Sequence, residues 1–201
     1  MKKITGILFA FLLLVSVSGV QAQSLDFGIK GGLSFATHRG DDVVEDPDMI
    51  VGFHIGGFAN FSILDLVQFE PGIYYSIKGA TQETVLPNAG TRELTMRTSF
   101  LDIPLLAKFS PAPIINVFIG PQPSILLNNK FTIKLNGEEE TESDTEGLRS
   151  FDLALVLGAG VDLPMGLTAS IGYDLGLLTI DEDGDIKGYN RVFKISVGYR
   201  F

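Results

Sequence analysis

The sequence contains no cysteine and no tryptophan. Without cysteine the chain can form no disulfide, no zinc–thiolate site and no lipid-modified cysteine. It also lacks an excess of basic residues, with 15 Lys and Arg against 24 Asp and Glu and a formal net charge of −9. Non-specific binding of nucleic acid requires a basic surface, so the composition argues against a nucleic-acid partner.

Long apolar runs are missing except at the amino terminus. There, two lysines precede an apolar stretch that ends at Val17, and Val20-Gln21-Ala22 places small residues where a signal peptidase cleaves. We predict a cleaved signal peptide over residues 1–22 and a single domain over residues 23–201. An uncleaved membrane anchor fits less well, because the stretch is short for a spanning helix.

The remaining sequence has an apolar period of two, which is typical of strands and excludes a helical body. In the last stretch, from Tyr189 to Phe201, the odd positions are mostly large and apolar, and the even positions are mostly small or charged. The same alternation predicts eight strands, at residues 25–35, 51–61, 67–77, 101–109, 115–127, 151–161, 167–177 and 189–201.

The connections between these strands alternate between long and short. The long ones are expected at residues 37–48, 79–93, 128–149 and 181–185, and the others are short turns. An antiparallel meander closed into a barrel places all long loops at one end and all short turns at the other. Pro121 and Pro123 each remove a backbone donor, so we expect a bulge or break in the fifth strand.

Alternation alone does not show which face of such a barrel is outside, since a soluble lipocalin-like barrel has the same period with its faces exchanged. The strand glycines lie mostly on the polar face, and the narrow interior of an eight-stranded barrel requires small residues. Aromatic residues gather towards both ends of the strands, as in the two interfacial girdles of a membrane barrel, although β-propensity alone also enriches aromatics. We therefore predict an all-β fold: an eight-stranded antiparallel up-and-down transmembrane β-barrel.

The predicted interior face carries charges of both signs in near balance. Because buried charge is tolerated only when paired, we expect a structural polar network and a closed lumen rather than an open channel. Its members are Asp26, Lys30, His54, Glu70, Lys78, Asp102, Lys108, Asp152, Asp162, Asp174, Lys194 and Arg200.

No catalytic, cofactor or metal site is expected from the motifs. His38 and His54 have no serine beside them, and only folding could bring Ser99 or Ser124 to either. The acidic loops would lie outside the cell, where clustered carboxylates could bind calcium or bridge divalent ions to lipopolysaccharide phosphates. The stretch Asp181–Asp185 lacks the twelve-residue calcium-loop pattern, so solvated acidic loops are the favoured interpretation.

Several segments resemble the porin-like outer-membrane β-barrel family of Bacteroidetes, the group that includes PorT-like proteins. The most specific is Leu101-Asp102-Ile103-Pro104-Leu105, and the resemblance covers the whole mature chain. It implies location in the outer membrane of a Gram-negative bacterium, with outer-membrane lipid as surroundings. It also implies insertion by the barrel-assembly machinery, which would recognise Tyr199 and Phe201 in the closing strand. Some relatives are linked to protein secretion, so secretion-apparatus proteins are candidate partners.

Together these observations favour a non-enzymatic outer-membrane protein with a structural or interaction role. Two other classes stay open at this point. One is a narrow porin-like channel for small solutes or ions, and the other is a membrane-embedded hydrolase, which the sequence supports least.

Overall fold

A computed structural model describes residues 25–40, 47–86, 90–135, 138–145, 147–181 and 187–201. The expected signal peptide over residues 1–22 lies outside this part of the chain. Ten antiparallel strands form the sheet within it. They are β1 (Leu25–Arg39), β2 (Asp48–Leu64), β3 (Val67–Leu86), β4 (Gly90–Asp102), β5 (Leu105–Ala112), β6 (Ile115–Leu135), β7 (Glu138–Ser143), β8 (Phe151–Asp162), β9 (Leu167–Thr179) and β10 (Tyr189–Arg200).

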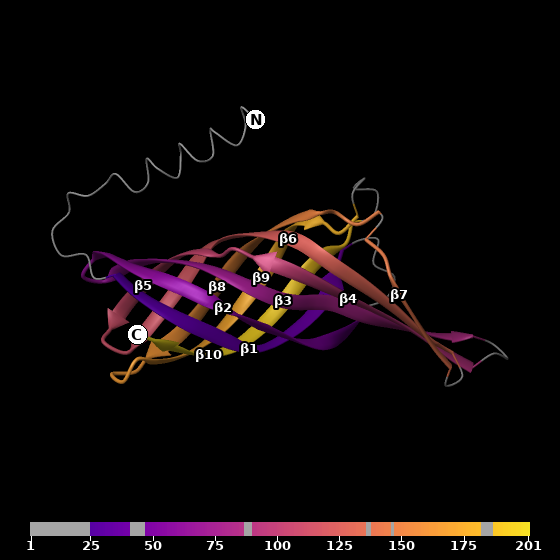
Figure 1. The fold of residues 1–201 in the computed structure, drawn as a ribbon, viewed down its shortest axis with the longest axis horizontal. Helices are drawn as coiled ribbons and strands as arrows, with labels where there is room; N and C mark the ends of the chain where they lie inside the picture. Colours follow the sequence, from indigo (N-terminus) through magenta and orange to yellow (C-terminus); the bar gives the residue numbers. More distant parts are fainter. Residues whose placement is uncertain (1–24, 41–46, 87–89, 136–137, 146, 182–186) are drawn as a thin grey trace, which may run out of the picture.

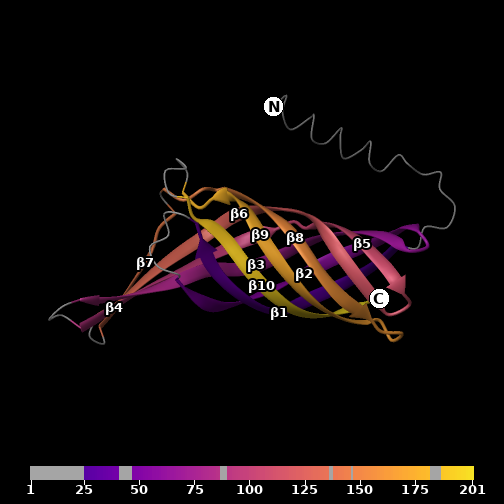
Figure 2. The same ribbon diagram turned by 180° about the vertical axis from the view of Figure 1, so that it is seen from behind.

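The sheet closes on itself because β1 pairs with both β2 and the last strand, β10. The contact between β1 and β10 runs in register from Gly28 opposite Arg200 to Arg39 opposite Tyr189. In the described part of the chain, β4 and β5 share one position in the ring and β7 lies outside it, which leaves 8 strands in a ring. The predicted eight-stranded antiparallel barrel is therefore confirmed (Figures 1 and 2).

The break expected at Pro121 and Pro123 lies in the neighbouring strand instead. β6 runs without interruption through both prolines and pairs with β8 there. Opposite them, the chain leaves the ladder at Ile103 and Pro104, between β4 and β5. A proline has no N–H to donate, so the adjacent strand cannot form a regular ladder at this point. The contact that remains is a hydrogen bond from Ile103 N to Pro123 O, 2.8 Å long.

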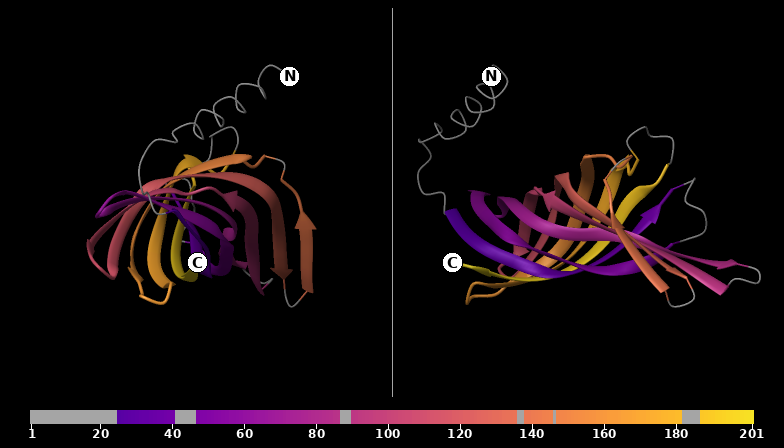
Figure 3. Two further views of the ribbon diagram at one scale, coloured as in Figure 1. Left: turned by 60° about the vertical axis from the view of Figure 1, so that its left-hand side comes forward. Right: turned by 45° about the vertical axis from the view of Figure 1, so that its right-hand side comes forward.

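The prediction of long loops at residues 79–93 and 128–149 was wrong, because polar residues in both segments form strands. β3 and β4 continue as a hairpin through residues 79–93, and residues 128–149 contain the end of β6 and all of β7. We call this extension the arm: residues 79–86, 90–99, 128–135 and 138–143, in the strand order β3-β4-β6-β7. Figure 1 and the right-hand view of Figure 3 show it projecting beyond the barrel, away from the carboxy terminus. Its threonines suit a strand as well as apolar residues do, but they carry no apolar signal.

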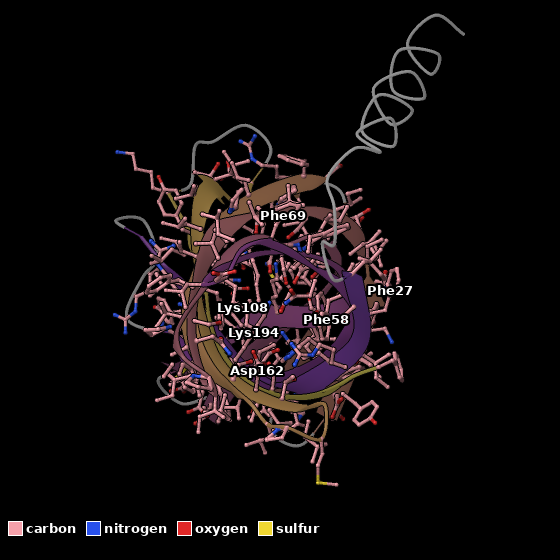
Figure 4. All side chains as sticks on the ribbon, turned by 90° about the vertical axis from the view of Figure 1, so that its left-hand side faces the viewer. Phe27, Phe58, Phe69, Lys108, Asp162 and Lys194 are labelled. Atoms are coloured by element: carbon pink, nitrogen blue, oxygen red, sulfur yellow. The ribbon has the colours of Figure 1, made fainter. Side chains whose placement is uncertain are left out.

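The outer face of the barrel is apolar and its interior is polar. Ile171 and Ile195 are 52% and 45% exposed, whereas Asp174 is 2% exposed. Viewed along the barrel, Phe27 lies outside the ring of strands, and Lys108, Asp162 and Lys194 lie within it (Figure 4). Burial thus confirms the predicted assignment of the two faces and excludes the lipocalin-like alternative. No helix in the described residues is long and apolar enough to cross a membrane.

Candidate functional site

The charged residues inside the barrel form two ion-pair clusters at different depths. The lower cluster lies nearer the short turns and combines Lys30, Glu70, Lys108 and Asp162, from β1, β3, β5 and β8. Lys30 Nζ donates to Glu70 Oε1 at 2.7 Å. Lys108 Nζ lies 3.3 Å from Glu70 Oε2 and 2.9 Å from Asp162 Oδ2, so it joins the two carboxylates. Strand alternation turns all four side chains inwards, since all have even numbers.

The central cluster combines Lys78, Asp102, Asp174 and Lys194, from β3, β4, β9 and β10. Lys78 Nζ lies 2.8 Å from Asp102 Oδ1. Lys194 Nζ lies 2.6 Å from Asp174 Oδ2 and 3.4 Å from Asp102 Oδ2. Each cluster contains two cations and two carboxylates, so each is electrically neutral. This neutrality lets four charges occupy a space that is closed to bulk water.

Neutral polar side chains complete the hydrogen bonding, and sequence analysis did not predict them as members of the interior network. Ser76 and Ser124 each donate to Asp102 at 2.7 Å. Gln122 Nε2 donates to Asp174 Oδ2 at 3.0 Å. A signal for these residues exists in the sequence, because they share the even-numbered positions of the charged ones. The same holds for Ser34, Asn60, Asn116 and Ser196, which are also buried.

Aromatic rings close the space around the lysines. Lys30 Nζ lies 4.7 Å from the centroid of the Phe58 ring, and Lys78 Nζ lies 4.6 Å from that of Phe100. Such contacts stabilise an ammonium group that has lost water. They also fill volume, because both rings are buried and point into the barrel.

The space between the two clusters is small. A cavity of about 60 Å³ is lined by Lys30 and Glu70 on one side and by Asp174 and Lys194 on the other, with His54 beside them. Ligand pockets for small molecules usually measure about 300–1,000 Å³. The cavity therefore has room for a few water molecules and not for a typical solute.

Four of the predicted network residues lie outside these clusters, namely Asp26, His54, Asp152 and Arg200. Asp152 is buried on the side of the arm, where Asn190 Nδ2 donates to its Oδ2 at 2.9 Å. Asp26 and Arg200 lie at the mouth near the short turns. Their closest atoms, Arg200 Nε and Asp26 Oδ2, are 3.9 Å apart and both side chains are partly exposed.

His54 is buried within the barrel and contacts two serines that sequence analysis had not considered. Its Nδ1 lies 3.1 Å from Ser34 Oγ, and its Nε2 lies 2.8 Å from Ser196 Oγ. The two serines that had been considered are placed elsewhere: Ser124 bonds to Asp102, and Ser99 faces outwards against the Tyr75 hydroxyl. Both imidazole nitrogens are thus occupied, and the ring lies far from the lipid face. Within the described residues, no group of three His, Asp or Glu side chains could hold a metal ion.

The two residues expected to guide assembly lie on the outer face. Tyr199 is 43% exposed and Phe201 is 72% exposed, and their ring centroids are 5.5 Å apart. Neither contributes to the interior network. Recognition of these rings by the assembly machinery stays a prediction.

Comparison with known proteins gives a family and a set of similar folds. A family model described as "Outer membrane protein beta-barrel domain" matches residues 21–182. Ail, the attachment invasion locus protein of Yersinia pestis, is 12% identical over 88% of this chain and 98% of its own, with a TM-score of 0.49. Neisserial surface protein A is 13% identical over 88% and 97%, with a TM-score of 0.43. The amino-terminal barrel of Pseudomonas aeruginosa OprF is 12% identical over 87% and 97%, with a TM-score of 0.35. A search of curated proteins found no match.

Proposed function

From the premise that this chain belongs to the outer membrane protein beta-barrel family and lies in the outer membrane of a Gram-negative bacterium, we propose that it is a non-enzymatic interaction protein of the cell surface. The observation that carries this proposal is the arm. A closed barrel has no free strand edges, but the arm adds two to the molecule. The barrel acts as the anchor and the arm as the contact surface.

The two edges of the arm are long enough to accept another strand. Among the described residues, β7 pairs with β6 alone, and β3 beyond Thr81 pairs with β4 alone. Unpaired edges present backbone N–H and C=O groups that an extended peptide can bind. All six residues of β7 are exposed, so its edge is open to a partner.

The charge of β7 indicates which partner fits this edge. Four of its six residues are glutamates, Glu138, Glu139, Glu140 and Glu142, and the ion pair between Lys134 and Glu139 is long at 3.7 Å. A second copy would bring the same carboxylates opposite these, which is unfavourable. An extended segment that carries lysine or arginine would pair with them.

The orientation follows from the connections. Barrels of bacterial outer membranes have short periplasmic turns and longer extracellular loops. Here the short connections, at residues 64–67, 112–115 and 162–167, lie at one end, and the arm lies at the other. The arm is thereby assigned to the outside of the cell. Since the chain has no cysteine, a Thr141→Cys variant tests this directly: a membrane-impermeant maleimide should label it on intact cells, and failure to label would contradict the assignment.

Crosslinking tests the contact surface. A photo-reactive amino acid in place of Thr141 on β7 should capture a partner from intact cells, and the same group in place of Ile171 on the lipid face is the matched control. We expect a protein adduct from position 141 alone. An excess of a lysine-rich extended peptide should reduce the yield of this adduct. Equal adducts from both positions, or none from position 141, would overturn the proposed surface.

Two further partners belong to the proposal. Secretion-apparatus proteins are candidates for the crosslinked partner, which the resemblance to PorT-like proteins supports. The barrel-assembly machinery is the proposed reader of Tyr199 and Phe201, which their exposure on the outer face supports.

A conductance measurement distinguishes the proposed function from the alternative of a solute channel. The two ion-pair clusters and the cavity of about 60 Å³ support a closed lumen. Purified protein in a planar bilayer should therefore show no stable unit conductance. A reproducible conductance step from the unmodified chain would favour the channel instead.

A further inference from the structure

We propose that Arg97 and Lys130, at the base of the arm, form a binding site for the phosphorylated sugar headgroup of a glycolipid in the outer leaflet. Its two cations lie on β4 and β6 rather than on β7, and the site concerns the membrane that surrounds the protein rather than a protein partner. It uses the orientation proposed above, in which the arm faces outwards.

The two cations are direct neighbours on the outer face. Arg97 of β4 lies opposite Lys130 of β6 in the strand register. Arg97 lies four residues from Leu101 on the same strand, so it is on the same side as this lipid-facing residue. Both cationic side chains are exposed. Like charges directly opposite each other on a sheet are destabilising unless an anion lies between them.

No carboxylate of the described residues forms an ion pair with either cation. The contrast with Lys134, four residues along β6, is direct, because Lys134 has Glu139 at 3.7 Å. A pair of cations that the described residues leave without a counter-charge is a suitable site for an external anion. Arginine and lysine together are common ligands of phosphate.

The guanidinium of Arg97 is directed across β3 towards the backbone of β2. On its other side, Arg97 lies opposite Gly79 of β3, which has no side chain to block it. The guanidinium reaches across β3, and its Nη1 donates to Val51 O of β2 at 3.2 Å. This carbonyl is available because the pairing of β2 with β3 shifts register between Met49 and His54. One donor is used in this way, and a guanidinium has about five N–H donors in total.

The level of the site is that of lipid headgroups. Tyr75 and Phe53 pack together on the outer face, with ring centroids 5.8 Å apart, as part of the aromatic girdle on the side of the arm. Such girdles mark the boundary between hydrocarbon and headgroups. The Tyr75 hydroxyl bonds to Ser99 Oγ at 2.9 Å. Arg97 is the next residue on that face of β4, one step further from the hydrocarbon.

A row of threonines above the cations favours a sugar headgroup. The four lie opposite one another across the arm, one on each strand, and two pairs are joined by hydroxyl hydrogen bonds of 2.9 and 3.1 Å. The row is formed by Thr81, Thr95, Thr132 and Thr141. It adjoins Arg97 and Lys130 on the side away from the membrane. Thr95 itself is buried, and its hydroxyl also donates to Glu93 Oε1 at 3.2 Å. A headgroup with its phosphate on the cations would therefore place its hydroxyls against the other three threonines and the Glu93 carboxylate.

The test compares binding of defined lipids to the full-length mature protein. The variants are the double substitution Arg97→Gln and Lys130→Gln, and Lys134→Gln as a matched control on the same face. Native mass spectrometry would measure binding of a phosphorylated diglucosamine lipid, of the same lipid without phosphate, and of phosphatidylglycerol. A heat-dependent gel shift would verify that each variant is folded.

We expect unmodified protein and the Lys134→Gln control to bind the phosphorylated glycolipid about tenfold more tightly than the double variant does, because two charge-assisted contacts are lost. Removing the phosphate from the lipid should weaken binding to the same extent. Equal binding by the double variant would overturn the site. Equal binding of phosphatidylglycerol, or full competition by inorganic phosphate, would overturn the assignment to a sugar headgroup. The measurement is independent of orientation in the cell, so its failure is distinguishable from failure of the labelling experiment.

Discussion

Lys78 Nζ lies 2.8 Å from Asp102 Oδ1, and neither side chain is more than 1% exposed. In the strand register Lys78 lies opposite Thr98, whereas Asp102 lies opposite Tyr74, so the lysine extends along the lumen to reach its partner. Asp102 also contacts Lys194 from the other side of the barrel. One carboxylate thus connects two lysines from strands that are not neighbours.

Asp102 is expected to be the residue of the lumen whose loss is most costly. An Asp102→Ala substitution leaves Lys78 buried without its main counter-charge. It also removes one of the two carboxylates that contact Lys194. We expect a loss of about 3–5 kcal/mol in the free energy of unfolding, the usual cost of removing one partner of a buried ion pair. Urea unfolding of the barrel in lipid vesicles would measure it.

Two controls show whether burial causes this cost. Asp26→Ala removes the partly exposed contact to Arg200 at the mouth and should change the free energy of unfolding by at most about 1 kcal/mol. Replacing Lys78 by Met and Asp102 by Leu together should be less destabilising than Asp102→Ala. The double substitution removes the lysine charge together with the carboxylate, so Lys78 no longer leaves an unpaired charge in the lumen. Equal losses for Asp26→Ala and Asp102→Ala would contradict the closed, charge-paired lumen.

A charge introduced on the outer face should also lower the stability of the barrel, but for a different reason. Ile195 is 45% exposed and lies midway along β10. Ile195→Arg should lower the free energy of unfolding in vesicles by about 2–4 kcal/mol, as for a cation near the midplane of a membrane barrel. Ile195→Leu is the control and should have little effect. If arginine were tolerated there as well as leucine, β10 would not face hydrocarbon at this point.

Gly79 is expected to be required for the close approach of β3 and β4 at the base of the arm. Its φ is +149°, and an added Cβ would lie 1.9 Å from Met96 O, so alanine cannot be accommodated without movement of the backbone. Gly79→Ala should cost about 1–3 kcal/mol in stability. It should also weaken glycolipid binding, because Arg97 reaches across this position.

Gly147 offers the matched comparison for this prediction. It also has a positive φ, of 75°, but an added Cβ would meet nothing within 4 Å. We expect Gly147→Ala to cost about 1 kcal/mol, from backbone strain alone, and to leave glycolipid binding unchanged. A larger loss for Gly147→Ala than for Gly79→Ala would contradict the close approach at the base of the arm.

Much of the barrel was predictable because the sequence pattern that identifies each strand is local. Alternation along each strand shows which side chains share a face, and the position of glycines shows which face is crowded. Lys30, Glu70 and Lys108 could be placed inside the barrel for this reason. The arm was missed because β7 and the end of β3 are mostly polar, so the short apolar alternation of Leu94 and Met96 on β4, opposite Ile133 and Phe131 on β6, was not predicted to form strands.

By itself, the sequence determined the fold class, the number of strands in the ring and the face on which the charged residues of the predicted strands lie, since all three depend on period and composition. Only the tertiary structure decided which charges pair, because pairing depends on strand tilt and register around a closed ring. Asp102 and Lys194 are 92 residues apart in the chain and meet only when β10 closes on β1. The neighbouring cations Arg97 and Lys130, which form no ion pair within the described residues, likewise follow from register alone, and with them the proposed contact to the membrane surface.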